Sequence, residues 1–348
     1  MPVSNTDIFN AVRAKMSPEF RDRIPAGTIE NMMEVGTMIT SKEYDTQFNA
    51  WLGELANLLV EQRFYNKVLE NPLQHLIKEG YSWGDAIETI FVGLRKGTKM
   101  DYGKDGQSID PFVKMNPDVH AEYHRVNEPI QYGVSVEKDR IRRAFYSAGG
   151  LQRLVDYIVG SLVSSANIDT WTLTKTEMAS YINDTKANCP LLSTQKITTT
   201  DITDKESAED FILQVKNTLS AMKFPNNTFN PQQYYKTLSK RDVTLFIKSD
   251  ILNTIGVKAM ANVFNPENLN MNIRFEEMDD FGIDVNGKGT DDVQAVLAED
   301  GWLLITSQFD ETEDIYNPRG RYRNFFKTRQ CSFGTTYMTD AVIFRKNW

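Results

Sequence analysis

The chain has 348 residues, which is enough for about two average domains or for one domain with long extensions. Apolar residues make up 41% and charged residues 25%, close to the averages of folded proteins, so disorder of the whole chain is excluded. The formal net charge of −8 argues against attraction of the whole molecule to nucleic acid.

The sequence offers no membrane span and no secretion signal. Its longest apolar runs, such as residues 90–92 and 302–305, are far shorter than the ~18 residues that a spanning helix needs. The first residues, MPVSNTDIF, lack a basic segment followed by an apolar one. We therefore expect synthesis in a cytoplasm and no membrane partner.

Two cysteines, Cys189 and Cys331, are present in the chain. Two are too few for a disulfide framework or a multi-cysteine zinc site. A single bridge between them stays open, although a reducing compartment disfavours it.

Residues 1–83 are predicted to be mostly helical. Asn5 and Thr6 are candidate caps for a helix over residues 7–16, and Ser17-Pro18 is typical of a helix start. Residues 42–63 predict an amphipathic helix, because apolar side chains recur at helical spacing: Phe48, Trp51, Leu52, Leu55, Leu58 and Leu59.

Two strand-like segments follow, separated by a polar stretch. Residues 86–97 are rich in β-branched and aromatic side chains, and residues 130–136 alternate strictly between apolar and polar or small. Residues 98–111 between them are rich in turn formers. We predict that the two strands form a long hairpin, with a polar outer part that has too few apolar residues for a core of its own.

A very long helix is predicted after the hairpin. Its first half presents one apolar face, formed by Leu151, Leu154, Val155, Ile158 and Leu162. If the helix continues to Ile182, it is about 48 Å long at 1.5 Å per residue.

The remainder of the chain mixes helices and strands. A helix is predicted over residues 205–222, with Phe211, Val215 and Leu219 on one face. Short strands and helices alternate over residues 243–248, 256–264, 271–278, 293–299 and 302–309, and residues 331–346 add one or two strands. The Asp300-Gly301 step is a hairpin signal. Because helices and strands are grouped in blocks, without a repeating βαβ unit, the predicted class is α+β.

Three side chains at alternate positions form a candidate metal site. On a strand, His120, Glu122 and His124 point to one face, as three zinc ligands could. The alternative is a solvated polar strand of the hairpin, which we favour because the sequence shows neither a fourth ligand nor a surrounding apolar shell.

Other candidate sites have simpler interpretations. Residues 285–292, VNGKGTDD, lack the leading glycine of a phosphate loop and are more simply a turn. The sequence has no Gly-x-Ser-x-Gly elbow, and neither cysteine has a basic neighbourhood. We therefore predict no catalytic, cofactor-binding or metal-binding residue.

Residues 317–329 interleave basic and aromatic side chains, a mixture that can bind nucleic acid or form a subunit interface. The acidic net charge and the turn-like start favour an interface or a plain surface. The side chains are Arg319, Arg321, Tyr322, Arg323, Phe325, Phe326, Lys327 and Arg329.

The order of these elements resembles the major capsid protein of tailed bacteriophages, with the Hong Kong 97 type fold. The strings similar to the small podophage, phi-twenty-nine-like branch are NPLQHLIKEGYSWGDAIETIFVG (71–93), RRAFYSAGGLQRLVDYIVGSL followed by IDTW (142–171), LFIKSDILNTIGVKAMANVFNP (245–266), and YNPRGRYRNFFKTRQCSF leading into DAVIF (316–344). Residues 1–70 match only in being helical.

The resemblance implies a role for each part of the chain. The parts are a helical N-terminal arm (1–83), an extended hairpin loop that lies across a neighbouring subunit (84–136), a peripheral domain with the spine helix (137–190), an axial domain (191–300), and strands that return to the peripheral domain (301–348). We assign no covalent cross-link, because the Lys-Asn motif of some relatives cannot be matched here.

The implied function is a non-enzymatic major capsid protein of the virion that self-assembles, as pentamers and hexamers, into an icosahedral head around double-stranded DNA. Scaffold and portal proteins are further implied partners, and contact with DNA would be non-specific. The alternatives are an encapsulin-type nanocompartment shell, a soluble metal-dependent enzyme that uses His120, Glu122 and His124, and a nucleic-acid-binding protein that uses residues 319–329.

Overall fold

The computed structural model describes residues 5–44, 46–48, 50–51, 54, 69–79, 86–94, 116–146, 150–184, 191–258 and 273–348. The chain forms two compact units, each built from segments that are far apart in the sequence. Unit 1 comprises Met1–Ser82, Val126–Thr172 and Thr306–Ser332, and unit 2 comprises Trp83–Arg125, Leu173–Ile305 and Phe333–Trp348.

Short helices form one end of unit 1. They are α1 (Asn5–Lys15), α2 (Pro18–Arg23), α3 (Met32–Ile39) and α5 (Lys138–Tyr146). The start of α2 was predicted correctly: Ser17 is its N-cap and accepts a hydrogen bond from the backbone N of Phe20. Helix α1 begins at Asn5, so this residue is inside the helix and does not cap it. Most of the predicted helix over residues 42–63 lies outside the described residues, but Phe48 and Trp51 are buried in the core of unit 1.

The long helix, α6 (Gly150–Ile182), has 33 residues and confirms the prediction almost to the residue. At 1.5 Å per residue it is about 50 Å long. Leu151, Leu154, Ile158 and Leu162 of the predicted face are buried in the core of unit 1, as a helix with one apolar stripe requires. The side chain of Val155 lies outside the described residues.

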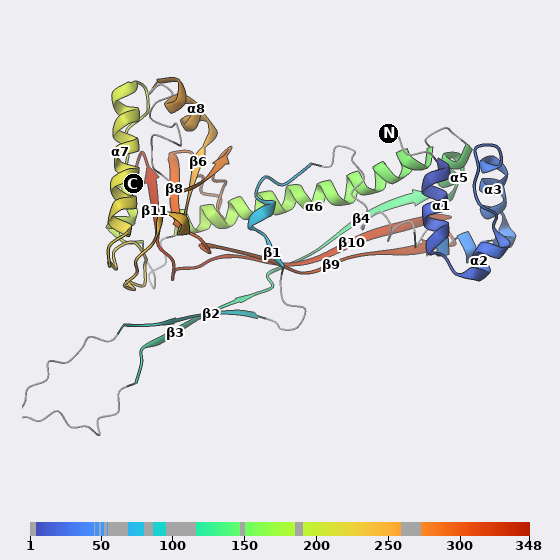
Figure 1. Cartoon of the computed structure of the whole chain (residues 1–348), viewed down its shortest axis with the longest axis horizontal. Helices are drawn as coiled ribbons and strands as arrows, with labels where there is room; N and C mark the ends of the chain where they lie inside the picture. Colours follow the sequence, from blue (N-terminus) through green and yellow to red (C-terminus); the bar gives the residue numbers. More distant parts are fainter. Residues whose placement is uncertain are drawn as a thin grey trace, which may run out of the picture. The chain divides into compact units, whose positions relative to one another are not determined.

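A four-stranded sheet runs along the part of α6 that belongs to unit 1 (Figure 1). Its order is β1 (Lys78–Glu79), β9 (Leu303–Asn317), β10 (Tyr322–Thr335) and β4 (Glu128–Glu137). Strand β4 pairs with β10 in antiparallel register over its whole length, from Glu128↔Cys331 to Glu137↔Tyr322. The prediction that residues 130–136 pair with residues 86–97 is therefore wrong, although both segments do contain strands.

The hairpin consists of β2 (Ala86–Val92) and β3 (Val119–Arg125), paired from Ala86↔Arg125 to Val92↔Val119. Its second strand is thus the polar segment that contains His120, Glu122 and His124. The sequence predicted a polar strand of the hairpin here, but the pairing with residues 86–97 was assigned to residues 130–136, because these have the apolar alternation by which strands are recognised. The predicted tip, residues 98–111, lies outside the described residues.

Unit 2 is built around a five-stranded sheet. Its order is β5 (Lys196–Thr198), β11 (Ala341–Arg345), β8 (Val293–Glu299), β6 (Val243–Lys248) and β7 (Arg274–Met278). Helix α7 (Lys205–Met222) lies along this sheet (Figure 1), and α8 (Ser249–Lys258) follows β6. Phe211, Val215 and Leu219 are buried in the core as predicted.

One local expectation in unit 2 needs correction, and another is tested only in part. Residues up to Lys258 of the segment 256–264 are helical, and its remainder lies outside the described residues. Gly301 does form a turn, with φ of 95°, but β8 and β9 on either side belong to different sheets. A glycine turn signal indicates a reversal of direction and does not by itself show that the flanking strands pair.

Short 3-10 helices complete the described structure: η1 (Lys42–Tyr44), η2 (Gln74–Leu76), η3 (Ser193–Gln195) and η4 (Lys240–Asp242). Among the helices in the described part of the chain, none is long and apolar enough to cross a membrane.

Candidate assembly surfaces

One face of the β2–β3 hairpin packs against other parts of unit 2. The ring of Phe91 stacks on the ring of Tyr234, with centroids 3.8 Å apart and planes at 16°. The His120 ring lies 5.5 Å from the same tyrosine, and the hydroxyl of Thr336 donates a 2.6 Å hydrogen bond to Glu122. Aromatic stacking and a hydrogen bond to a carboxylate therefore fix this face of the hairpin.

These contacts account for the three residues considered as metal ligands. His120, Glu122 and His124 do share one face of β3, as the sequence spacing predicts, but His120 contacts Asp118 at 3.1 Å. Burial lowers the pKa of His124, while the nearby Glu122 carboxylate opposes the shift. Within the described ranges, no cluster of three or more potential metal ligands is formed.

The opposite face of the hairpin is apolar and exposed. Ile90 and Val92 on β2 are each 56% exposed, and Leu94 beyond the strand is 76% exposed. Val119 and Tyr123 on β3 are exposed on the same face. The Tyr123 hydroxyl donates a 2.7 Å hydrogen bond to Glu88, and this bond raises the pKa of the tyrosine. A contiguous exposed apolar face of this kind is typical of a surface that binds a protein partner.

The basic segment 317–329 has a different environment from the one that nucleic-acid binding requires. Arg323, Lys327 and Arg329 point to the buried face of β10. Arg323 forms an ion pair with Asp314, Lys327 forms one with Asp310, and Arg329 donates a 2.6 Å hydrogen bond to Thr170 on α6. Side chains that are buried and paired cannot at the same time bind phosphates, so most of the basic charge predicted here is structural.

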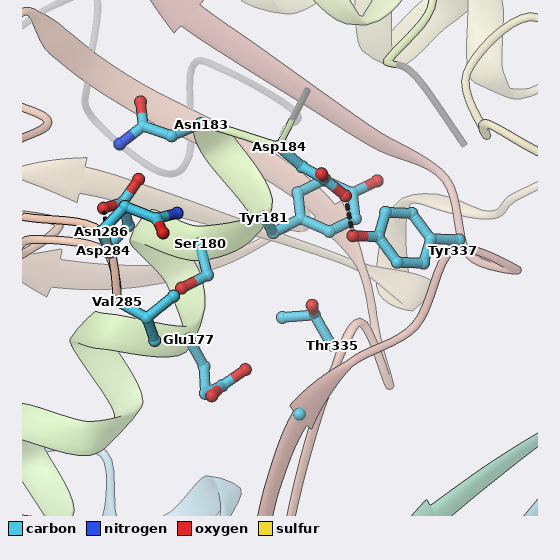
Figure 2. Close-up of a pocket in the computed structure, with 11 residues that line it drawn as sticks. Glu177, Ser180, Tyr181, Asn183, Asp184, Asp284, Val285, Asn286, Thr335 and Tyr337 are labelled. Atoms are coloured by element: carbon cyan, nitrogen blue, oxygen red, sulfur yellow. Dashed lines mark hydrogen bonds between the residues drawn. The ribbon is translucent and has the colours of Figure 1, made fainter. Parts of the chain in front are cut away.

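A cavity of about 270 Å³ lies in unit 2 between α6 and the segments near Asp284 and Tyr337 (Figure 2). Tyr337 donates a hydrogen bond to Asp184 across it. Asp284 directly precedes the segment 285–292, and its carboxylate accepts hydrogen bonds from the backbone N of Asn286 and of Lys288. The segment is thus a turn closed by the preceding aspartate, as the simpler interpretation predicted.

The comparisons with known proteins identify the class of molecule to which these surfaces belong. The family model described as "Phi29-like phage major capsid protein" matches residues 9–345. The chain belongs to the Phi29-like phage major capsid protein family. It is therefore a structural protein that forms a capsid, is not an enzyme, and has its place in the virion.

Relatives and solved structures agree with this family. The chain is 25% identical over 346 residues to the major capsid protein of Bacillus phage B103, covering 97% of this chain and 72% of that protein. It is 24% identical to the major capsid protein of Streptococcus phage Cp-1, covering 98% of this chain and 93% of that protein. A chain in the capsid structure of Staphylococcus phage Andhra has the same fold, with a TM-score of 0.61, 12% identity, and coverage of 81% and 86% of the two chains.

For a Phi29-like major capsid protein, the relevant sites are surfaces and not catalytic groups. The β-branched and aromatic content of residues 86–97 predicted a strand but did not indicate which of its faces is exposed. Tyr234 and Thr336 were missed altogether, because a tyrosine or threonine in a polar loop has no periodic pattern that would reveal a long-range contact.

Proposed function

We propose that copies of this chain assemble into a closed icosahedral shell of pentamers and hexamers that encloses double-stranded DNA. In this shell, residues 84–125 form the loop that lies across a neighbouring subunit and residues 1–83 form the arm. Residues 126–190 and 301–335 form the peripheral domain, whereas residues 191–300 and strand β11 form the axial domain, because β4 pairs with β10 and β11 pairs with β8. Assembly takes place in the host cytoplasm, with scaffold and portal proteins as further partners.

The observation that supports this proposal best is the two-sided β2–β3 hairpin. One face is held by Tyr234 and Thr336, whereas the face with Ile90 and Val92 is apolar and exposed. Burial of such a face against a second copy stabilises the contact by about 25 cal/mol for each Å² of apolar area removed from water. The exposed apolar face of the hairpin is therefore suited to contact with a neighbouring copy of the chain.

Particle formation tests the proposal. The purified chain, with scaffold protein where needed, is expected to sediment as megadalton particles that electron microscopy shows as shells or tubes. Ile90→Ser with Val92→Ser should reduce particle yield while leaving the melting temperature of the unassembled subunit unchanged. Leu213→Ser on α7, where the side chain is 54% exposed, removes one exposed apolar side chain elsewhere and should assemble normally. A wild-type chain that stays monomeric at high concentration would contradict the proposal.

A further inference from the structure

The acidic side chains of β9 in unit 1 differ in their surroundings. Asp310 and Asp314 form ion pairs with Lys327 and Arg323 on the neighbouring strand β10. Glu311 and Glu313 are exposed, and in the described part of the chain no basic side chain pairs with either. Because successive residues of a strand point to opposite faces, these two glutamates lie together on the outward face.

The edge of the sheet that carries these glutamates is open. Strand β1 pairs with β9 only at Thr306 and Ser307, and the rest of that edge has no strand partner among the described residues. Exposed charges on an open edge hinder non-specific pairing with other strands. They also leave a pair of carboxylates accessible to a partner of opposite charge.

Exposed arginines gather at one end of the same unit. Arg319 and Arg321 lie in the turn between β9 and β10, and the carbonyl of Arg321 accepts a 2.9 Å hydrogen bond from the backbone N of Lys138, at the start of α5. Helix α5 carries further exposed arginines, Arg142 and Arg143 among them. No acidic side chain within the described ranges pairs with either of these two.

The remaining arginine of α5, Arg140, has an aromatic partner within the same unit. The guanidinium of Arg140 lies over the ring of Tyr157, 4.0 Å from its centroid. Residues 137–143 contain two acidic side chains, Glu137 and Asp139, and more basic ones, so this segment carries a net positive charge. We define Arg142, Arg143, Arg319 and Arg321 as the arginine patch.

We propose that the arginine patch of one copy binds Glu311 and Glu313 of a second copy. The inference rests on the proposed assembly of copies into a shell. Two different patches that meet across copies form a heterologous contact, which can repeat around a ring or a shell. Arginine suits this contact because its planar fork binds carboxylates in a bidentate manner and because arginine is enriched in interfaces.

Charge reversal tests the contact. Arg142→Glu with Arg143→Glu should lower particle yield about tenfold, because like charges then face each other, and Glu311→Arg with Glu313→Arg should do the same. The combined variant should restore the yield to within about threefold of wild type. The melting temperature of each unassembled subunit is measured in parallel. The neutral variants, Arg142→Gln with Arg143→Gln and Glu311→Gln with Glu313→Gln, replace any reversal variant that fails to fold.

A control variant and the following outcomes decide whether the arginine patch binds Glu311 and Glu313. Lys240→Glu with Arg241→Glu on η4 changes the net charge by the same amount and should assemble like wild type. Normal assembly of either reversal variant, or no recovery in the folded combined variant, would overturn the inference. Normal particles that retain less DNA in the arginine variant would also overturn it, since the patch would then contact phosphates. Failure of wild type itself to assemble would refute the proposed function and the inference with it.

Discussion

Nδ2 of Asn230 donates a 2.8 Å hydrogen bond to Oδ1 of Asp340, and both side chains are fully buried in unit 2. The second carboxylate oxygen of Asp340 has no hydrogen-bond partner among the residues that the structure describes. Glu299 forms a 2.8 Å ion pair with Lys236, and its carboxylate also accepts a hydrogen bond from the backbone N of Asp340. Burial raises the pKa of Asp340 to about 6, and the Glu299 charge adds to the shift while the Asn230 hydrogen bond opposes it.

This pKa makes the stability of unit 2 depend on pH. A carboxyl group whose pKa is higher in the folded state than in the unfolded state stabilises the fold at low pH, and the contribution is lost as pH rises through about 6. Asp340→Asn keeps an acceptor for Asn230 and removes the buried charge. We expect it to raise the free energy of unfolding at pH 7 by about 2–3 kcal/mol and to remove this part of the pH dependence.

Urea unfolding of the unassembled subunit between pH 4.5 and pH 8 measures both effects. Asp242→Asn is the control, because hydrogen bonds from Ser239 lower the pKa of this exposed group. It should not stabilise the subunit at pH 7. An Asp340→Asn variant that is less stable than wild type at pH 7 would show that the carboxylate is stabilised where it lies.

Two glycines in helices of unit 1 should respond in opposite ways to alanine. A Cβ added at Gly36 on α3 would lie 2.6 Å from Cβ of Phe145, whereas a Cβ added at Gly160 on α6 would meet no atom within 4 Å. Gly36→Ala should destabilise by about 1–3 kcal/mol because the contact overpacks the core. Gly160→Ala should stabilise by about 0.5–1 kcal/mol because alanine favours the helix. Thermal melting of the two variants separates these effects, and equal shifts would contradict the packing described at Gly36.

Sequence periodicity predicted the elements of this fold better than their partners. Helices α6 and α7 and strand β8 were predicted within a residue or two, because the helices have long apolar periodicity and β8 is a short, almost continuous apolar run. The pairing of strands was harder to predict. Strand β4 pairs with β10, which lies almost 200 residues later in the chain, and no pattern in either strand indicates its partner. The turn at Gly301 likewise gave no information about the sheet to which each flanking strand belongs.

The roles of the surfaces were even harder to predict from the sequence. Arg323 and Lys327 resembled a nucleic-acid site until their ion pairs with Asp314 and Asp310 were visible. Alternation along the chain shows that residues share a face but not whether that face is inside or outside. The resemblance to tailed-phage capsid proteins predicted the class correctly, because similar stretches of 18 or more residues carry more information about the family than the spacing of a few residues.

Deletion of the hairpin tip tests the prediction that the hairpin extends from the body of the subunit and is not part of its core. Residues 98–115 lie outside the described structure, and the strands that flank them, β2 and β3, have their own cross-strand pairs from Ala86↔Arg125 onward. Deletion of residues 98–115 with a short Gly-Ser link should therefore leave the unfolding temperature of the unassembled subunit nearly unchanged and reduce particle yield. Loss of folding in this variant would mean that the tip belongs to the core of a unit.

The buried face of α6 gives the most direct test of the long helix. Ile158 is 3% exposed within the core of unit 1, and Ile168 on the same helix is 47% exposed. Ile158→Asp places an unpaired carboxylate in an apolar site and should cost about 4 kcal/mol or more, enough to prevent folding of a marginally stable subunit. Ile168→Asp, with the same change in chemistry at an exposed site, should cost less than about 1 kcal/mol. Soluble yield and circular dichroism melting compare the two variants. Normal melting of Ile158→Asp would show that this face of α6 is not part of the core, because only an exposed site tolerates the charge.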